Sequence, residues 1–239
     1  MGQEKGGWLL IGGRRRLGKA LAQRLAGDGP LVLTSSSTWE GDAGWVAECS
    51  QRGLIRTLSW DANDPGVESQ MMADLKALEA DGIRVKNAVL VAGTFHEQPL
   101  GSWEGAALDA FWRVNLSFPL LAAQAIGPLL EEGGCLQFLL DTAVHRPWLK
   151  RLPYSVAKTG LSALIPGLAQ LLAPRVRVVG HALGTVLPDE ASDPAFLADR
   201  SLLKRVGSPD DVVRSLRYAA NSPFLTGEIL TLDGGRRWI

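Results

Sequence analysis

The stretch WLLIGGRRRLGKALAQRLA, residues 8–26, predicts a β-strand, a glycine turn and an amphipathic helix in immediate succession. The apolar run Trp8–Ile11 ends at Gly12 and Gly13, and apolar residues then recur at helical spacing. Such a turn directs backbone N–H groups and the positive end of the helix toward a phosphate. Gly12 and Gly18 allow tight turning and close approach of the backbone. The turn therefore indicates a phosphate site, with an ordinary strand-to-helix loop as the alternative.

The turn also carries an unbroken run of three arginines at positions 14–16. A charge run is commonly a solvated face, but cations inside a phosphate loop favour an anionic ligand. About twenty residues beyond such a loop, a cofactor without an extra phosphate normally meets an acidic residue that binds its ribose hydroxyl. This chain has Ser35 and Ser36 in that region, so we predict NADP rather than NAD. Glu40 and Asp42 lie close enough in sequence to keep NAD open.

Tyr154 and Lys158 lie four residues apart, and Asp141 lies thirteen residues before the tyrosine. On a helix, residues at this spacing share one face. A neighbouring cation favours the phenolate, so we expect Lys158 to lower the pKa of Tyr154 toward the range where a proton is passed at neutral pH. The carboxyl of Asp141 could orient the tyrosine and couple to its proton. An incidental pair on a surface helix is the alternative interpretation.

The chain has 239 residues, 46% of them hydrophobic, and a formal net charge of zero. That length is enough for one α/β domain or two small ones. The neutral balance argues against a nucleic-acid partner. With two cysteines and three histidines in no cluster, we expect no disulfide framework, no metal site and a cytoplasmic location. The sequence contains no long apolar run and no secretory signal, so we expect no membrane segment.

Strand-like and helix-like segments alternate along the chain, which predicts an α/β fold. This alternation is typical of a Rossmann-like, doubly wound parallel sheet of about seven strands with helices on both faces. We expect a long helix over residues 109–130 and another over residues 154–172 that is broken or bent near Pro166. The expected strands cover residues 8–11, 31–34, 55–60, 88–92, 135–140, 176–179 and 229–232.

Ligands of such sheets bind at the carboxyl ends of the strands. The first, fourth and fifth expected strands end at residues 12–18, at residues 93–95 and at Asp141. The sequence therefore predicts that the glycine turn and Asp141 line one crevice.

Several signatures together resemble the short-chain dehydrogenase/reductase family over nearly the whole chain. They include the glycine turn, the pair at residues 154–158 and Asn115 in the preceding long helix. Asp61 with Ala62 matches the family's adenine-contacting pair of an aspartate and an apolar residue. The segment LTGEIL followed by DGG, within residues 225–235, resembles the family's C-terminal strand.

Two departures from the general family pattern resemble the pteridine reductases. The middle glycine of the turn is replaced by Arg16, and the position usually occupied by serine, thirteen residues before the tyrosine, is Asp141. The segment GTFHEQPL, residues 93–100, is similar to the substrate loop of that group. It places Phe95 where a phenylalanine stacks on the pterin ring.

Other positions depart from the family. The Asn-Asn-Ala-Gly expected after the fourth strand is LVAG at residues 90–93, the Pro-Gly expected after the sixth is LG at residues 183–184, and His181 stands where an apolar residue is usual. These differences leave open a shifted substrate, a slower enzyme or a neutral repacking. A general NADPH-dependent carbonyl or 3-ketoacyl reductase therefore stays an alternative, and so does an NADP-binding protein without turnover.

The resemblance implies one domain over residues 1–239 that uses NADPH to reduce a pterin-like ring, dihydropterin to tetrahydropterin. It also implies a homo-oligomer, tetramer or dimer. The catalytic residues it implies are Asp141, Tyr154, Lys158 and Asn115. The substrate-binding residues it implies are Arg16, Phe95, Asp141 and Tyr154. The cofactor-binding residues it implies are Gly12, Arg14, Arg15, Arg16, Leu17, Gly18, Ser35, Ser36, Asp61, Ala62, Ala92, Gly93, Tyr154, Lys158, Gly184 and Val186.

Overall fold

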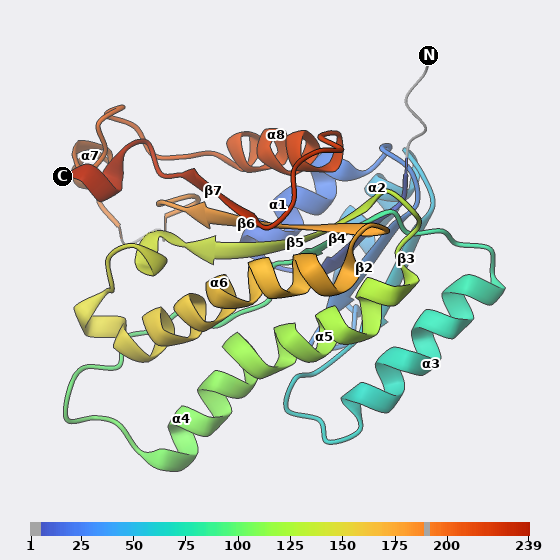
Figure 1. Ribbon diagram of the computed structural model, residues 1–239, viewed down its shortest axis with the longest axis horizontal. Coiled ribbons are helices and arrows are strands. Elements are labelled where there is room, and N and C mark those ends of the chain that lie inside the picture. The colour runs from blue at the N-terminus through green and yellow to red at the C-terminus, as the bar shows by residue number, and fades with distance from the viewer. Residues whose placement is uncertain (1–5, 189–191) are drawn as a thin grey trace.

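The computed structural model describes residues 6–188 and 192–239 and is built on a seven-stranded parallel sheet (Figure 1). The strands run in the order β3-β2-β1-β4-β5-β6-β7, so the predicted doubly wound sheet of about seven strands is confirmed. The strands are β1 (Trp8–Ile11), β2 (Leu31–Ser35), β3 (Ile55–Ser59), β4 (Asn87–Leu90), β5 (Gly134–Asp141), β6 (Val176–Leu183) and β7 (Glu228–Leu232).

Helices cover both faces of the sheet, as Figure 1 shows. One face carries α3 (Val67–Ala80), α4 (Gly105–Trp112), α5 (Phe118–Ile126) and α6 (Leu152–Leu172). The other carries α1 (Arg16–Leu25), α2 (Ala43–Ser50) and α8 (Pro209–Ala220), and α7 (Pro194–Asp199) lies near the C-terminal end of the chain. A π-helical turn covers Arg113–Ser117, and short 3₁₀ turns lie at Gly127–Leu129, Thr142–Val144, Leu149–Arg151 and Arg236–Trp238.

The alternation of side chains along β1 fills two separate apolar cores. Trp8 and Leu10 point toward α1 and α8, whereas Leu9 and Ile11 point toward α3, α5 and α6. All four side chains are buried, because parallel strands of this fold have helices on both faces. Full burial of such a side chain contributes about 1.5–3 kcal/mol. This one short strand therefore fixes the position of the glycine turn that follows it.

The helix predicted over residues 109–130 is not regular, because a π turn separates α4 from α5. Asn115, in the middle of this turn, donates a hydrogen bond from Nδ2 to the Phe111 carbonyl at 3.0 Å. In a regular α-helix, that carbonyl would accept the backbone N–H of Asn115. The side chain competes for this acceptor, which accounts for the wider turn.

Other element boundaries also differ from the prediction. Strand β6 continues to Leu183 instead of ending at residue 179, and β4 ends at Leu90 instead of residue 92. The helix predicted to be broken or bent near Pro166 is not broken, since α6 continues through it, and a bend there stays a prediction. The helix is held by a buried stripe that includes Ile165, so tertiary packing compensates for the hydrogen bond that proline cannot donate. Within the described ranges, no helix is long and apolar enough to span a bilayer.

We predict that Gly18→Ala destabilises the fold. A Cβ at this position would lie 2.0 Å from the Gly12 carbonyl oxygen, so either the helix or the turn must move. We expect a loss of about 2 kcal/mol or more in the free energy of unfolding, measured by urea titration. Gly44→Ala in α2 is the matched control, because a Cβ there meets no atom within 4 Å. Equal stability of the two variants would contradict this prediction.

Candidate active site

The loops after β1, β4, β5 and β6 meet at one edge of the sheet, because these strands are neighbours and all run in the same direction. Gly12, with a φ of 91°, packs directly on the segment after β4, and a Cβ on it would lie 2.8 Å from Ala92 N. A Cβ on Gly184, the first residue after β6, would lie 2.8 Å from Asp233 Cα. The structure thus brings the glycine turn, the segment after β4 and Asp141 to one edge, as the sequence predicts.

A buried polar centre lies at this edge between the π turn and α6. Asn115 is fully buried, its Oδ1 accepts the Thr94 N–H at 3.0 Å, and its Nδ2 donates to Thr94 Oγ1 at 2.9 Å. Lys158 donates from Nζ to the Leu139 carbonyl at 3.1 Å. A Cβ on Gly93 would lie 3.0 Å from Asn115 Oδ1 and 3.7 Å from Lys158 Nζ. Glycine at position 93 therefore leaves open the space directly beside the ammonium group.

Burial lowers the pKa of Lys158 to about 8, although the neighbouring Asp141 raises it. An ammonium group has three N–H donors, and burial makes each unpaired donor costly. Within the described residues, the hydrogen bond assigned to Nζ is the one to Leu139. The side chain is thus suited to hold hydroxyl groups of a ligand that enters beside Gly93.

The prediction that Lys158 lowers the pKa of Tyr154 is wrong for this structure. The pKa of Tyr154 is raised well above its usual value, first by burial and then by the charge of Asp141 and a hydrogen bond to it. Arg151 lowers this pKa only in part. Lys158 Nζ lies 5.6 Å from the centre of the tyrosine ring, over its face. Burial and the carboxyl of Asp141 therefore both keep the proton on the phenol, and the two acids act as a coupled pair.

Asp141 ends β5 and is held by donors that gather on one of its oxygens. Its Oδ1 accepts the Trp148 indole N–H at 2.7 Å and the Ala143 backbone N–H at 2.7 Å. Burial raises the pKa of Asp141, whereas these two donors, Lys158 and Arg236 lower it. Trp148 and Arg236 are not among the site residues that the sequence predicts. Nothing in their spacing from Asp141 predicts the contact, because it forms only when the chain folds.

Phe95 lies at the mouth of the site and not in the core. Its side chain is 52% exposed, and its ring meets that of Tyr154 edge to face at 4.9 Å between centres. The Arg151 guanidinium lies 4.4 Å from the centre of the same ring and forms an ion pair with Glu97 at 3.4 Å. Phe95 is thus an exposed apolar surface beside the coupled acids, the position in which a ring-binding residue is expected.

The three arginines of the turn have different surroundings. Arg14 forms an ion pair with Asp42 and a hydrogen bond with Ser37, so much of its charge is neutralised. Arg15 is exposed. Arg16 has a φ of 46° and donates from Nη2 to the Leu187 carbonyl at 2.9 Å. The left-handed φ is easy for glycine and strained for arginine, so Arg16 links the turn to the loop after β6 at some conformational cost.

The remaining predicted cofactor residues extend from this centre in both directions along the sheet. Ser35 is buried at the end of β2, and Ser36 beside it is exposed. Asp61, after β3, accepts the Asn63 backbone N–H at 3.0 Å, and Ala62 is buried. Leu17 and Gly18 lie in the first turn of α1, and Val186 lies after β6, in a bridge with Gly207.

The matches with known proteins agree with this geometry. A family model described as enoyl-(acyl carrier protein) reductase matches residues 12–237. The short-chain dehydrogenase/reductase from Serratia marcescens superposes with a TM-score of 0.87 at 22% identity, covering 97% of this chain and 98% of that one. The chain belongs to the short-chain dehydrogenase/reductase family. It is an oxidoreductase of that family with a nicotinamide cofactor and a small-molecule substrate.

Two curated relatives are similar to this short-chain dehydrogenase/reductase over 95% of both lengths. The dihydromonapterin reductase of Shigella boydii is 27% identical over 240 residues. Carbonyl reductase family member 4 of Xenopus laevis is 26% identical over 234 residues. The two sequence identities are nearly equal, so they do not distinguish a pterin substrate from a carbonyl substrate. That distinction has to come from the geometry of the site.

The unusual His181 lies outside the site and is a structural residue. It is fully buried in β6, and its ring nitrogens form hydrogen bonds with Gln137 Oε1 and Ser215 Oγ, each at 2.9 Å. Burial lowers its pKa from 6.5 to about 4.

We predict that His181 makes stability depend on pH. The folded protein keeps the ring neutral down to about pH 4, whereas the unfolded chain takes up a proton near pH 6.5. The stability it contributes is therefore present above pH 6.5 and is lost as the pH falls toward 4. Between pH 7.5 and pH 5, we expect His181→Gln to lose about 2 kcal/mol less unfolding free energy than the wild type. His96→Gln, at an exposed histidine, should keep the wild-type dependence; identical curves for all three proteins would refute this assignment.

Proposed function

We propose that this protein is an NADPH-dependent reductase that transfers hydride to a pterin-like ring, converting a dihydropterin to a tetrahydropterin. The observation that carries the proposal is the buried carboxyl of Asp141 coupled to Tyr154 beside the exposed ring of Phe95. A serine in place of Asp141 could only hydrogen-bond, whereas a carboxyl can also hold and release a proton. The similarity to dihydromonapterin reductases supports this interpretation.

The residues at the edge of the sheet fit a dinucleotide. Gly12 and Gly18 allow the turn to pack so tightly that its backbone N–H groups can face a pyrophosphate. Asn115 orders the Thr94 segment next to the open space at Gly93, and Lys158 offers its remaining donors to the hydroxyls of a ribose. When bound there, NADPH supplies the hydride.

The preference for NADP rests on the surroundings of the arginine turn. Arg15 is exposed and available to a 2′-phosphate, with Ser35 and Ser36 on the neighbouring strand end. Asp42 also lies beside the arginine turn, but Arg14 neutralises its charge. Hydrogen bonds from Trp45 and Arg14 lower the pKa of Asp42. A carboxylate in an ion pair repels a phosphate less than a free carboxylate does, so Asp42 is compatible with NADP as the cofactor.

The coupled acids supply the proton that hydride transfer to a ring requires. Burial keeps protons on both Asp141 and Tyr154 to higher pH than usual. A proton held by the pair can pass to the ring nitrogen next to the carbon that receives hydride. Phe95 offers an apolar face to a flat ring, and offset stacking contributes about 0.5–1.5 kcal/mol beyond burial. Arg16, which spans from the glycine turn to Leu187, lies where it can contact both phosphate and substrate.

A general carbonyl or 3-ketoacyl reductase is the second candidate. The similarity to carbonyl reductase family member 4 favours it. The absent asparagines at residues 90–93 also permit it. A non-catalytic NADP-binding protein is a weaker candidate, since Asn115, Tyr154 and Lys158 lie together in a polar centre that a purely structural role does not require. The predicted cytoplasmic location and dimeric or tetrameric assembly stay predictions.

The direct test measures oxidation of NADPH and NADH with dihydrobiopterin, dihydromonapterin and an acetoacetyl thioester. We expect turnover of the pterins, with NADPH preferred. Tyr154→Phe should lower kcat by about a hundredfold or more, the usual scale for a general acid. Turnover of the thioester alone would reject the pterin substrate, and absence of turnover with cofactor binding intact would favour the non-catalytic candidate.

We predict that Trp148→Phe shifts the pH profile of the reductase. The indole N–H stabilises the ionised form of Asp141, so its removal raises the pKa of that carboxyl further. The coupled acids then keep their proton to higher pH, and the alkaline limb of kcat/KM moves upward. Trp112→Phe is the matched control, because its indole donates to the Pro153 carbonyl at 3.1 Å and not to a titratable group. An unmoved alkaline limb in Trp148→Phe would show that the indole does not tune Asp141.

A further inference from the structure

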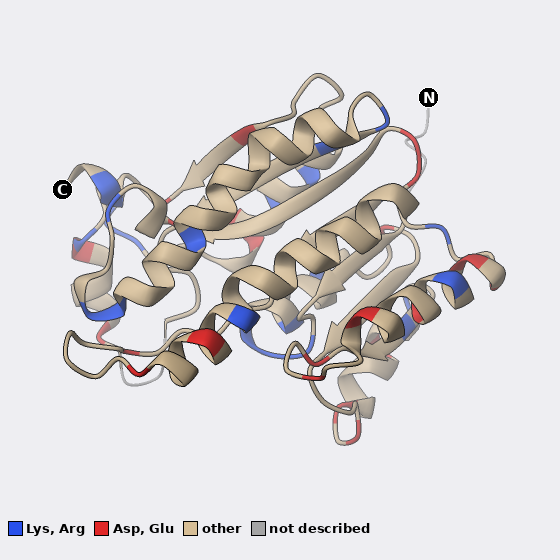
Figure 2. Cartoon of the chain, turned by 60° about the horizontal axis from the view of Figure 1, so that its bottom comes forward, with Lys and Arg blue, Asp and Glu red and all other residues tan. Residues whose placement is uncertain are grey.

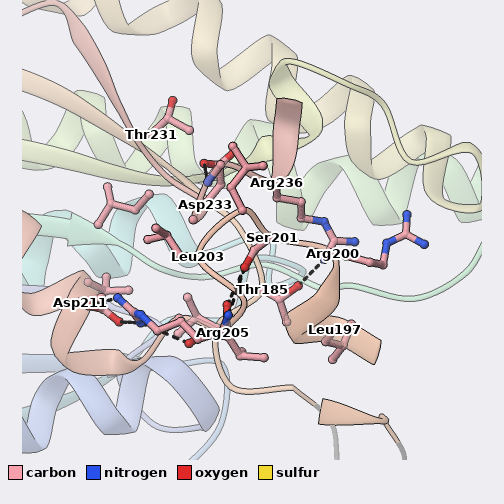
Figure 3. Close-up of a pocket in the computed structure, with 18 residues that line it drawn as sticks. Thr185, Leu197, Arg200, Ser201, Leu203, Arg205, Asp211, Thr231, Asp233 and Arg236 are labelled. Carbon is pink, nitrogen blue, oxygen red and sulfur yellow. Dashed lines mark hydrogen bonds and ion pairs between the residues drawn. The ribbon is translucent and has the colours of Figure 1, made fainter. Parts of the chain in front are cut away.

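A cavity of about 450 Å³ lies between the loops that follow β6 and β7 (Figure 3). Its size is in the range of small-molecule sites. One wall is the 3₁₀ turn Arg236–Trp238 with the β7 end, and the other is the segment between α7 and α8. The charged residues that line it are Arg200, Arg205, Arg236, Asp211 and Asp233.

Two of these arginines lack a carboxylate partner within the described residues. Figure 3 shows Arg200 and Arg236 side by side at one end of the cavity, and the pKa of Arg236 is lowered by burial and then by Arg200. The ion pairs found among the described residues include neither side chain. Asp233 lies close by, but its two oxygens accept the Gly235 and Arg237 backbone N–H groups at 2.8 and 3.0 Å.

The third arginine of the cavity differs and provides an internal comparison. Arg205 forms a two-pronged ion pair with Asp211, at 2.8 Å from Nη1 to Oδ2 and 3.1 Å from Nη2 to Oδ1. Asp211 also accepts the backbone N–H of Ser208, the N-cap residue of α8, as part of a capping box. The charge of Arg205 is therefore compensated by a direct ion pair, whereas no such pair to Arg200 or Arg236 is found among the described residues, and Asp141 and Asp233 act on Arg236 only from a distance. Two adjacent guanidinium groups repel each other unless an anion lies between them.

Arg236 connects this cavity to the catalytic carboxyl through one side chain. Its guanidinium carbon lies 4.8 Å from the centre of the Trp148 ring, and the Trp148 indole donates to Asp141 at 2.7 Å. Arg236 also donates from Nη1 to Thr185 Oγ1 at 2.9 Å, next to the predicted cofactor residues Gly184 and Val186. Figure 2 shows further Lys and Arg segments close to the C-terminal end of the chain. A substrate at Asp141 therefore lies next to a positively charged wall.

We propose that Arg200 and Arg236 bind a carboxylate on the tail of the substrate, so that this reductase selects ring substrates with an acidic tail over neutral ones. The inference rests on the proposed function and adds the substrate class to it. Guanidinium groups bind carboxylates through two parallel hydrogen bonds, and the partly buried Arg236 gains more from such a bond than an exposed side chain would. The cavity has the volume for the tail, and Trp148 lies between Arg236 and Asp141.

The test compares two ligands with the same type of ring. Dihydrofolate carries a tail with two carboxylates, and dihydrobiopterin carries a short neutral one. Binding is measured by quenching of tryptophan fluorescence in the NADP⁺-loaded protein, which cannot transfer hydride to either ligand. We expect the wild type to bind dihydrofolate about tenfold more tightly than dihydrobiopterin, and Arg236→Gln and Arg200→Gln each to remove most of that preference.

Arg205→Gln is the matched control, since it removes the same charge from the same cavity but at a paired arginine. It should keep the wild-type preference. An equal loss of the preference for dihydrofolate in Arg205→Gln would show that the effect depends on the general charge of the cavity, and it would overturn the assignment to Arg200 and Arg236. Equal binding of both ligands by the wild type would also overturn the assignment. Arg200 is exposed, so its variant should fold even if Arg236→Gln does not. If neither ligand binds the wild type, both the pterin function and this inference fall; if both bind with the expected preference but are not reduced, only the proposed function fails.

Discussion

Burial of one ammonium and one carboxyl around a single phenol is the constraint on which this site depends. Lys158, Asp141 and Tyr154 are all withdrawn from water, and the pKa of each shifts in the direction that disfavours its charged form. The buried ammonium of Lys158 and the carboxylate of Asp141 stabilise each other because they lie close together. The consequence is a pair of acids that hold their protons to higher pH than usual, beside an ammonium group that can donate hydrogen bonds to the hydroxyls of a ligand. A serine at position 141 would leave the ammonium of Lys158 without that carboxylate and would change the pKa values of both Lys158 and Tyr154.

The fold delivers this arrangement through backbone features as much as through side chains. Gly12 and Gly18 let the first strand, its turn and α1 pack closer than any side chain would allow. The π turn at Asn115 places a buried amide where it orders the segment after β4. Parallel strands bring these loops to one edge, because their carboxyl ends lie together. Catalytic geometry thus follows from the same close packing that stabilises the sheet.

The environment of Asp141 also links the reacting centre to the distal cavity. Trp148 donates to the carboxyl on one side and stacks with Arg236 on the other. One indole therefore tunes an acid and forms part of a cationic wall at the same time.

The sequence by itself determined the parallel α/β sheet and the glycine turn, because strand and helix periodicity are local properties. It also predicted Tyr154 and Lys158 from their spacing and Asn115 from the family resemblance. Only the tertiary structure decided that α6 continues through Pro166, since packing of the helix outweighs the missing hydrogen bond. It also decided that burial and Asp141 raise the pKa of Tyr154 instead of Lys158 lowering it, because burial and distance cannot be inferred from spacing along the chain. The roles of Trp148 and Arg236 belong to the same class, since these residues meet Asp141 only where separate segments of the chain come together.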